Sequence, residues 1–206
     1  AINQCFSNSG QSCSAPTRLL IPEIYINNIN NIIIDHVKTL NFGDPIDTNT
    51  SHGPVVNQKQ YNTIQNFIKS GIDEGFELLT GGLGNPANCN NGYFIRPTVF
   101  INVDNTATIA QEEIFGPVLS IISYSDIDDA IDIANNSKYG LSNYISCLDY
   151  DEGCNIAKRI HSGQSIINKI SRGSVPAPFG GFKLSGNGRE HGKYGLEEYL
   201  EIKAII

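Results

Sequence analysis

The sequence contains no methionine at any of its 206 positions, and its first residue is Ala1. It also lacks a basic, apolar leader at its N-terminus, which excludes a secretory signal peptide in these residues. The missing methionine predicts a piece cut from the interior or the C-terminal part of a longer polypeptide. Removal of an initiator methionine before Ala1 is the simpler alternative.

Positive charge, long apolar runs and paired cysteines are also scarce. A formal net charge of −7 argues against nucleic acid or an anionic membrane surface as a partner. No apolar run approaches the roughly 20 residues that a membrane-spanning helix needs. The cysteines lie at irregular spacing without a C-x-x-C pair, so neither a zinc site nor a disulfide framework is indicated. We therefore expect a cytoplasmic protein without a metal site.

What is present describes an ordinary globular chain, with 40% apolar and 17% charged residues. Its length allows one domain with a sizeable core, or two small ones. Predicted strands alternate with predicted helices along the chain. The strands are expected at residues 17–22, 76–80, 93–103, 117–124, 144–147 and 164–168. The helices are expected at 23–40, at 57–75, after Ser125-Asp126, which would cap the helix that follows, and at 151–161.

This alternation predicts right-handed βαβ crossovers and an α/β fold, with a mainly parallel twisted sheet flanked by helices. The apolar run from 117 to 124 has the pattern of a buried strand. The segment 93–103 contains Pro97, which predicts an edge or bulged strand. Residues 199–206 could form a last strand, and the Gly-rich stretch 169–192 a long functional loop.

Cys13 is the residue whose surroundings say most about chemistry. It lies in the segment FSNSGQSCSA (residues 6–15), among small side chains that leave a thiol open to a substrate carbonyl. Buried structural cysteines usually have bulky apolar neighbours instead. The pattern predicts an accessible thiol, with an inert cysteine as the plain alternative.

Three segments together carry a resemblance to a known family. They are the cysteine segment, EEIFGPV (residues 112–118) and PFGGFKLSGNGRE (residues 178–190). The chain resembles the catalytic half of the NAD(P)-dependent aldehyde dehydrogenase superfamily, over nearly all of its residues. The resemblance implies that residues 1–206 are the catalytic, C-terminal domain, with that family's sheet, and that an N-terminal cofactor-binding domain is missing.

The resemblance also implies a role for particular residues. Cys13 would attack the aldehyde to give a thiohemiacetal, which becomes a thioester after hydride transfer to NAD or NADP and is then hydrolysed to the acid. Its backbone N–H would be one of two oxyanion donors. Glu113 would accept hydrogen bonds from the nicotinamide ribose, and Phe115 would pack beside the nicotinamide. Phe179 would line the aldehyde pocket, while Asn168 would steady the active-site loop.

The family's general base, a glutamate, and the second oxyanion donor, an asparagine, have no counterpart in these residues. The sequence alone is therefore expected neither to bind NAD usefully nor to oxidise aldehydes. Expected partners are a small aldehyde, the missing N-terminal domain and further copies in a homo-oligomer, paired through the edge at 201–206. Arg172 could select an anionic aldehyde or be an ordinary surface arginine.

Two other functions remain open from the residues alone. Cys13 could serve a cysteine hydrolase or acyltransferase with His161 or His191 as its base. The chain could also be a non-catalytic folding or interaction module, in which Cys13 would be buried. Glu113 could be a solvated charge at a helix end, and Phe115 a simple core aromatic.

Overall fold

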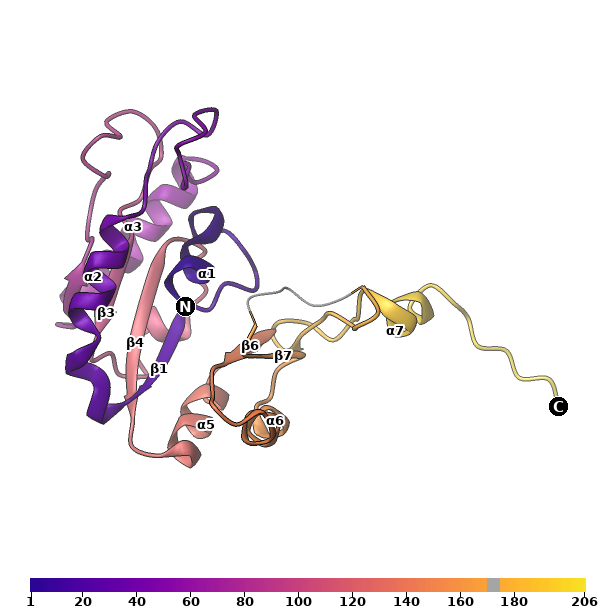
Figure 1. Ribbon diagram of the computed structural model, residues 1–206. Coiled ribbons are helices and arrows are strands. Elements are labelled where there is room, and N and C mark those ends of the chain that lie inside the picture. The colour runs from indigo at the N-terminus through magenta and orange to yellow at the C-terminus, as the bar shows by residue number, and fades with distance from the viewer. Residues whose placement is uncertain (170–174) are drawn as a thin grey trace. The chain divides into compact units, whose positions relative to one another are not determined.

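The structure is a computed structural model that describes residues 1–169 and 175–206 (Figure 1). The described chain forms two compact units, Ala1–Ala130 and Ile131–Ile206. Each unit has its own sheet structure, and the two are described separately below. Arg172 lies outside the described residues, as does part of the predicted loop 169–192.

The first unit is built on a four-stranded sheet in the order β1-β4-β3-β2. Its strands are β1 (Arg18–Pro22), β2 (Glu77–Thr80), β3 (Thr98–Ile101) and β4 (Val118–Tyr124). The central strand β4 runs parallel to both of its neighbours, while β2 is antiparallel at the edge. The sheet is thus mixed but mainly parallel and flanked by helices, which confirms the predicted fold class.

The prediction of an edge strand at 93–103 was wrong. Strand β3 is shorter, lies between β4 and β2, and has four buried residues. Pro97 does not interrupt β3, because the strand begins one residue later, at Thr98. The missing N–H of proline therefore removes no hydrogen bond between the strands. The other alternative predicted for this segment was a bulged strand. The pairing of β3 with β2 does contain a register shift, which lies on the β2 side between Leu78 and Thr80.

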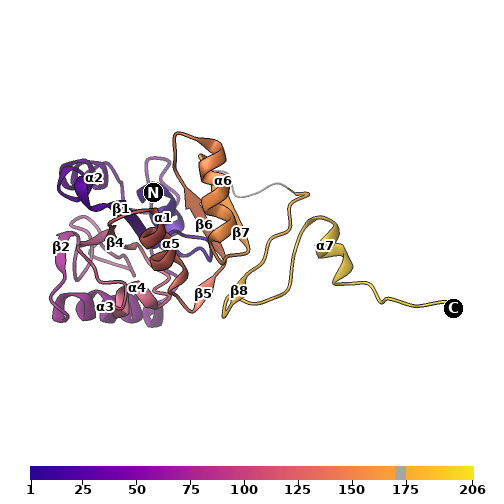
Figure 2. The same ribbon diagram turned by 90° about the horizontal axis from the view of Figure 1, so that it is seen from below.

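Alternate residues of the strands face two different layers of helices, as the period of a strand requires. One face carries Val99, Ile101, Leu119 and Ile121, which form a core cluster with buried residues of α1 (Ile2–Phe6) and α2 (Asn30–Lys38). Figure 2 shows these helices on one side of the sheet and α3 and α4 on the other.

The opposite face packs against α3 (Gln58–Asp73) and α4 (Thr108–Gln111). Phe100 is fully buried there, and a Cβ added to Gly71 of α3 would lie 2.9 Å from its ring. The approach of helix to sheet therefore needs a glycine at this position. Burial of each such large apolar side chain contributes about 1.5–3 kcal/mol to folding.

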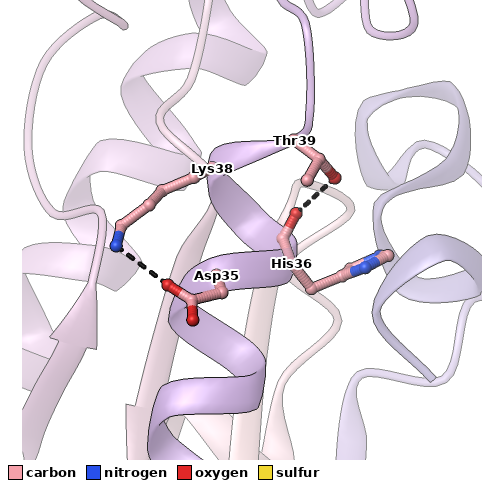
Figure 3. A network of polar contacts seen from close by, with 4 residues as sticks. All are labelled: Asp35, His36, Lys38 and Thr39. Carbon is pink, nitrogen blue, oxygen red and sulfur yellow. Dashed lines mark hydrogen bonds and ion pairs between the residues drawn. The ribbon is translucent and has the colours of Figure 1, made fainter.

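The helix predicted for 23–40 is divided in two. Residues Glu23–Asn28 form a 3₁₀ helix, η2, and α2 follows it. Asparagine pairs favour such a break because asparagine is a poor helix former. Figure 3 shows the C-terminal turn of α2, where Lys38 pairs with Asp35 at 3.0 Å and the Thr39 hydroxyl donates to the His36 carbonyl at 2.7 Å. Both charged side chains of this pair are exposed, so it adds little stability.

The second unit contains a βαβ motif, as the alternating pattern predicted. Strand β6 (Ser142–Ile145) runs parallel to β7 (Gln164–Ile167), and α6 (Tyr150–Arg159) connects them. The Asp149 side chain caps α6 by accepting from the N–H groups of Asp151 and Glu152, at 2.8 and 3.3 Å. Such a cap satisfies donors that the first helical turn leaves without a partner.

The remaining elements of the chain are short. Helix α5 (Ile127–Asn135) spans the boundary of the units, and its predicted cap is confirmed, since Asp126 accepts from the Asp129 N–H at 2.9 Å. In the second unit β5 (Tyr139–Gly140) pairs antiparallel with β8 (Phe182–Lys183), and α7 spans Gly192–Glu197.

The strand expected at 199–206 is not formed. Residues 201–206 are exposed and belong to no helix or strand. A strand needs a neighbour for its backbone groups, and none pairs with this segment among the described residues. Over residues 1–169 and 175–206, no helix is both long and apolar enough to cross a membrane.

Candidate active site

Cys13 is exposed, in agreement with the prediction of an accessible thiol. It follows the helix α1 and a short turn, η1 (Ser7–Gly10), and lies in a tight turn closed by the Ala15 N–H on the Ser12 carbonyl at 3.0 Å. Within residues 1–169 and 175–206, neither its thiol nor its N–H has a hydrogen-bond partner. Cys13 is therefore accessible to a ligand, and its exposure argues against the non-catalytic module, in which it was expected to be buried.

The backbone before Cys13 is strained. Asn8, Ser9 and Gly10 all adopt positive φ angles, of 53°, 55° and 75°. For Asn8 and Ser9 this conformation costs about 1–2 kcal/mol each, and it persists only where the surroundings fix it. We call residues 8–13, which end at the predicted nucleophile, the nucleophile turn. Strain of this kind is concentrated at functional sites.

Side chains of the nucleophile turn hold it in this conformation. The Asn8 side chain donates to the Gln11 carbonyl and the Gln11 side chain donates to the Asn8 carbonyl, both at 3.1 Å. The Ser9 hydroxyl donates to the Gly53 carbonyl at 2.6 Å, and the Val56 N–H donates to Gln11 Oε1 at 2.8 Å. Four hydrogen bonds thus fix a backbone that would otherwise relax.

A second strained segment carries the predicted cofactor residues. Residues 112–117 connect α4 to β4, and we call them the acidic corner. Glu113 is exposed, the preceding helix ends beside it, and Phe115 has a φ of 55° with 36% of its surface exposed. The ring of Phe115 is thus no core aromatic. Ile114, between them, is 1% exposed and anchors the corner in the core.

The nucleophile turn and the acidic corner pack directly against each other. A Cβ added to Gly10 would lie 2.2 Å from the carbonyl carbon and oxygen of Gly116, so the two backbones are in contact. Helix α1 supports this contact between the two backbones. Its Cys5 is fully buried, and the Cys5 thiol donates to the Val118 carbonyl, next to the acidic corner, at 3.6 Å. Burial raises the pKa of Cys5 to about 12, so this thiol is inert.

The loop that follows α2 borders the nucleophile turn through Gly53 and Val56, and it contains a buried histidine. His52 is 7% exposed, stacks on Phe42 with ring centroids 4.9 Å apart and shares a hydrogen bond of 2.7 Å with the Ser51 hydroxyl. Burial lowers its pKa below the ordinary value.

Neither histidine of the first unit is engaged with Cys13. His52 bonds to Ser51, and His36 shares a hydrogen bond of 2.6 Å with the Asn3 side chain. The bases that a cysteine hydrolase would use, His161 and His191, both belong to the second unit.

Two predicted residues also belong to the second unit, and each has a defined setting there. Phe179 is half-buried and exchanges two backbone hydrogen bonds with Glu190, at 2.8 and 2.7 Å. Asn168 accepts from the Cys147 N–H at 2.9 Å and donates to the Cys147 carbonyl at 2.8 Å. Asn168 thus joins the ends of β6 and β7, which is a structural role.

Sequence reasoning missed two glutamines at the site. Gln11 holds the nucleophile turn, and the Gln60 side chain donates to the carbonyls of Ile114 and Phe115, both at 3.0 Å. One signal was present: Asn57 followed by Gln60 has the spacing of a helix start, and Asn57 does cap α3. That spacing says nothing of which way the Gln60 side chain points.

Comparison with known proteins gives the family. The sequence model of the aldehyde dehydrogenase family matches residues 1–205. A relative from Staphylococcus haemolyticus is 48% identical over 200 residues, which are 97% of this chain and 42% of that protein. The chain thus spans less than half the length of this relative.

Solved structures of the family are similar to nearly the whole chain. A mutant aldehyde dehydrogenase C from Pseudomonas syringae, in complex with NAD+ and octanal, has 44% identity and a TM-score of 0.96, over 99% of this chain and 42% of that one. An aldehyde dehydrogenase from Mycobacterium tuberculosis, in complex with NAD+, has 42% identity and a TM-score of 0.92, over 96% of this chain and 41% of that one. This chain therefore belongs to the aldehyde dehydrogenase family.

Proposed function

We propose that residues 1–206 are the catalytic domain of an NAD(P)-dependent aldehyde dehydrogenase that oxidises an aldehyde to a carboxylic acid. One observation carries the proposal: an exposed thiol lies on a strained turn whose backbone packs against the acidic corner. Family membership and relatives solved with NAD+ support it.

Cys13 is the nucleophile in this proposal. Its thiolate attacks the carbonyl carbon, a C–S bond forms, and the carbonyl electron pair moves to the oxygen. The N–H of Cys13, which has no partner among the described residues, can donate a hydrogen bond to that oxygen. After oxidation of the adduct to a thioester, water attacks the acyl carbon, the C–S bond breaks, and the thiolate is released with the acid.

The residues of the acidic corner fit a nicotinamide nucleotide. Glu113 is exposed, and an ionised carboxylate is a strong acceptor for the two hydroxyls of a ribose. Phe115 presents part of its ring beside it, which suits packing against a planar heterocycle. When bound, NAD(P) supplies the hydride acceptor. Glu113 would orient the ribose and Phe115 would limit the movement of the nicotinamide.

Phe179 belongs to the aldehyde pocket in this proposal, and its pairing with Glu190 fixes the backbone that presents it. The general base that activates water lies outside these residues. We therefore expect the isolated chain to produce no NADH from aldehyde and NAD+. Steady production of NADH by the purified 206-residue chain would contradict this expectation.

The nucleophile is tested by substitution in the natural polypeptide that contains these residues. We expect Cys13→Ala to abolish dehydrogenase turnover, followed as NADH absorbance, because no other group forms the thioester. Cys154→Ala is the matched control, a partly exposed cysteine of the second unit that should keep full turnover. Turnover retained by Cys13→Ala would end the assignment.

A further inference from the structure

One short segment touches both halves of the candidate site. Residues 53–60, which we call the bracket, lead into α3 and include its first turn. At one end the bracket bonds to the nucleophile turn, and at the other it bonds to the acidic corner. All three segments belong to the first unit.

The bond between the bracket and the nucleophile turn runs through Gln11. The Val56 N–H donates to Gln11 Oε1 at 2.8 Å. Gln11 is two residues before Cys13 in the sequence. Because a backbone N–H can only donate, the side-chain oxygen of Gln11 must face it. Gln11 then has its amide nitrogen free to donate to the Asn8 carbonyl at 3.1 Å, inside the strained turn.

The bond between the bracket and the acidic corner runs through Gln60. Its amide nitrogen donates to the Ile114 and Phe115 carbonyls, both at 3.0 Å, so here the glutamine is the donor. The start of α3 fixes Gln60, whose N–H donates to Asn57 Oδ1 at 2.9 Å. One turn later in α3, the Ile64 side chain occupies the space beside Gly116. A Cβ added to Gly116 would lie 2.5 Å from the Cδ1 atom of Ile64.

We propose that Gln11 and Gln60 are positioning residues that hold the Cys13 thiol and the Glu113–Phe115 corner at a fixed separation through the bracket. This inference rests on the proposed function. It assigns the two glutamines different kinetic roles. Gln11 sets the position of the nucleophile and so acts on kcat, whereas Gln60 sets the position of the cofactor residues and so acts on KM for NAD(P).

The opposite polarity of the two contacts allows a crossed test. Glutamate at position 11 keeps the acceptor for the Val56 N–H and loses only the side-chain donor to the Asn8 carbonyl, which still accepts from the Gln11 N–H at 3.1 Å. Lysine at position 11 removes the acceptor for the Val56 N–H. Lysine at position 60 keeps a donor for the two carbonyls, while glutamate there places oxygen against oxygen. The same pair of substitutions must therefore have opposite effects at the two positions, which a general loss of stability would not produce.

The crossed test is carried out in the natural polypeptide. We expect Gln11→Met and Gln11→Lys to lower kcat about tenfold, with Gln11→Glu within about threefold of the unchanged enzyme, since small displacements of a reacting group are costly. We expect Gln60→Met and Gln60→Glu to raise KM for NAD(P) about tenfold, with Gln60→Lys within about threefold. Gln58→Met is the control: Gln58 is exposed in the same turn of α3 and bonds to no described side chain.

A structural measurement on the 206-residue chain needs no activity. Hydrogen exchange of the Val56 amide should become at least about fivefold faster in Gln11→Met and stay unchanged in Gln60→Met, because only the first loses its acceptor. Alkylation of Cys13 by iodoacetamide should stay within about twofold in both variants, because the thiol is exposed in either case.

The outcomes separate this inference from the proposed function. If Cys13→Ala lacks turnover while Gln60→Glu keeps its KM, the bracket is not a positioning device and the proposed function stands. If Cys13→Ala is active, the proposed function fails, and the roles assigned to the glutamines fail with it. Rescue by lysine at position 11, or by glutamate at position 60, would also overturn the inference.

Discussion

The two units of this chain differ in how they are held together. The first unit contains a four-stranded sheet with helices on both faces, and it holds most of the buried apolar side chains. In the second unit, Ile131 and Ile166 are the only buried large aliphatic side chains among those described. Fully exposed apolar side chains, such as Leu148 and Ile202, are found there instead.

This difference shows which of the predicted site residues the chain can hold in a rigid setting. The nucleophile turn and the acidic corner both attach to the well-packed sheet, through α1, β4 and the first turn of α3. Strained backbone requires such support, because only a rigid surrounding structure holds a residue in a costly conformation. Phe179, by contrast, is presented by a unit with a small core.

The largest effect is expected from the same substitution made in the two cores. Ile121→Ala in β4 should lower the free energy of unfolding of the first unit by about 4 kcal/mol, because its site is fully buried. Ile166→Ala in β7 should cost about 2 kcal/mol, because that side chain is less completely buried, with 7% of its surface exposed, and belongs to a smaller core. Urea unfolding followed by tyrosine fluorescence and circular dichroism measures both values. Equal costs would mean that the second unit is as tightly packed as the first.

A smaller effect is expected from alanine at two glycines with positive φ. Gly10→Ala should cost about 2–3 kcal/mol, because the new Cβ would collide with the Gly116 backbone. Gly186→Ala in the second unit should cost about 1 kcal/mol, since nothing lies within 4 Å and only the backbone angle is unfavourable.

The two glycine variants also test the contact between the turn and the corner. Thermal unfolding gives the stability of each variant. If Gly10→Ala is no more destabilising than Gly186→Ala, the nucleophile turn does not pack on the acidic corner as described.

The smallest effect concerns pH. His52 has a lowered pKa in the folded state, so the unfolded state binds more protons and stability rises with pH. The contribution of His52 is complete above the ordinary histidine pKa of about 6.5 and is lost as the pH falls toward the lower, folded value. We therefore expect the first unit to be less stable at pH 5 than at pH 7 because of this residue.

His52→Phe should remove that part of the pH dependence, as measured by urea unfolding at the two pH values. His161→Gln in the second unit is the control and should leave the pH profile of the first unit unchanged. An unaltered profile in His52→Phe would show that the buried imidazole is not responsible.

Features that depend on neighbouring residues were predicted from the sequence. The apolar run of β4, the βαβ motif of β6, α6 and β7, and the cap of α5 all follow from local pattern. The exposed Cys13 followed from its small neighbours. Strand β3 was misplaced because Pro97 is adjacent to the strand and the sequence does not say which strands will flank it.

Features that depend on distant contacts were not predicted. The strain at Phe115, the packing of Gly10 on Gly116 and the hydrogen bonds of Gln11 and Gln60 all join segments far apart in the sequence. No periodicity or capping pattern encodes such contacts. The resemblance did identify Cys13 and Glu113 as residues of interest, and the structure adds that their two segments pack together.

Trapping the covalent intermediate tests the assignment of Cys13 as the nucleophile. The natural polypeptide is mixed with NAD+ and a straight-chain aldehyde, quenched in acid during turnover, digested and analysed by mass spectrometry. We predict the mass of one acyl group on the peptide that contains Cys13, and no such adduct in Cys13→Ala. An acyl group on another residue, or turnover without any adduct on Cys13, would show that Cys13 is not the nucleophile.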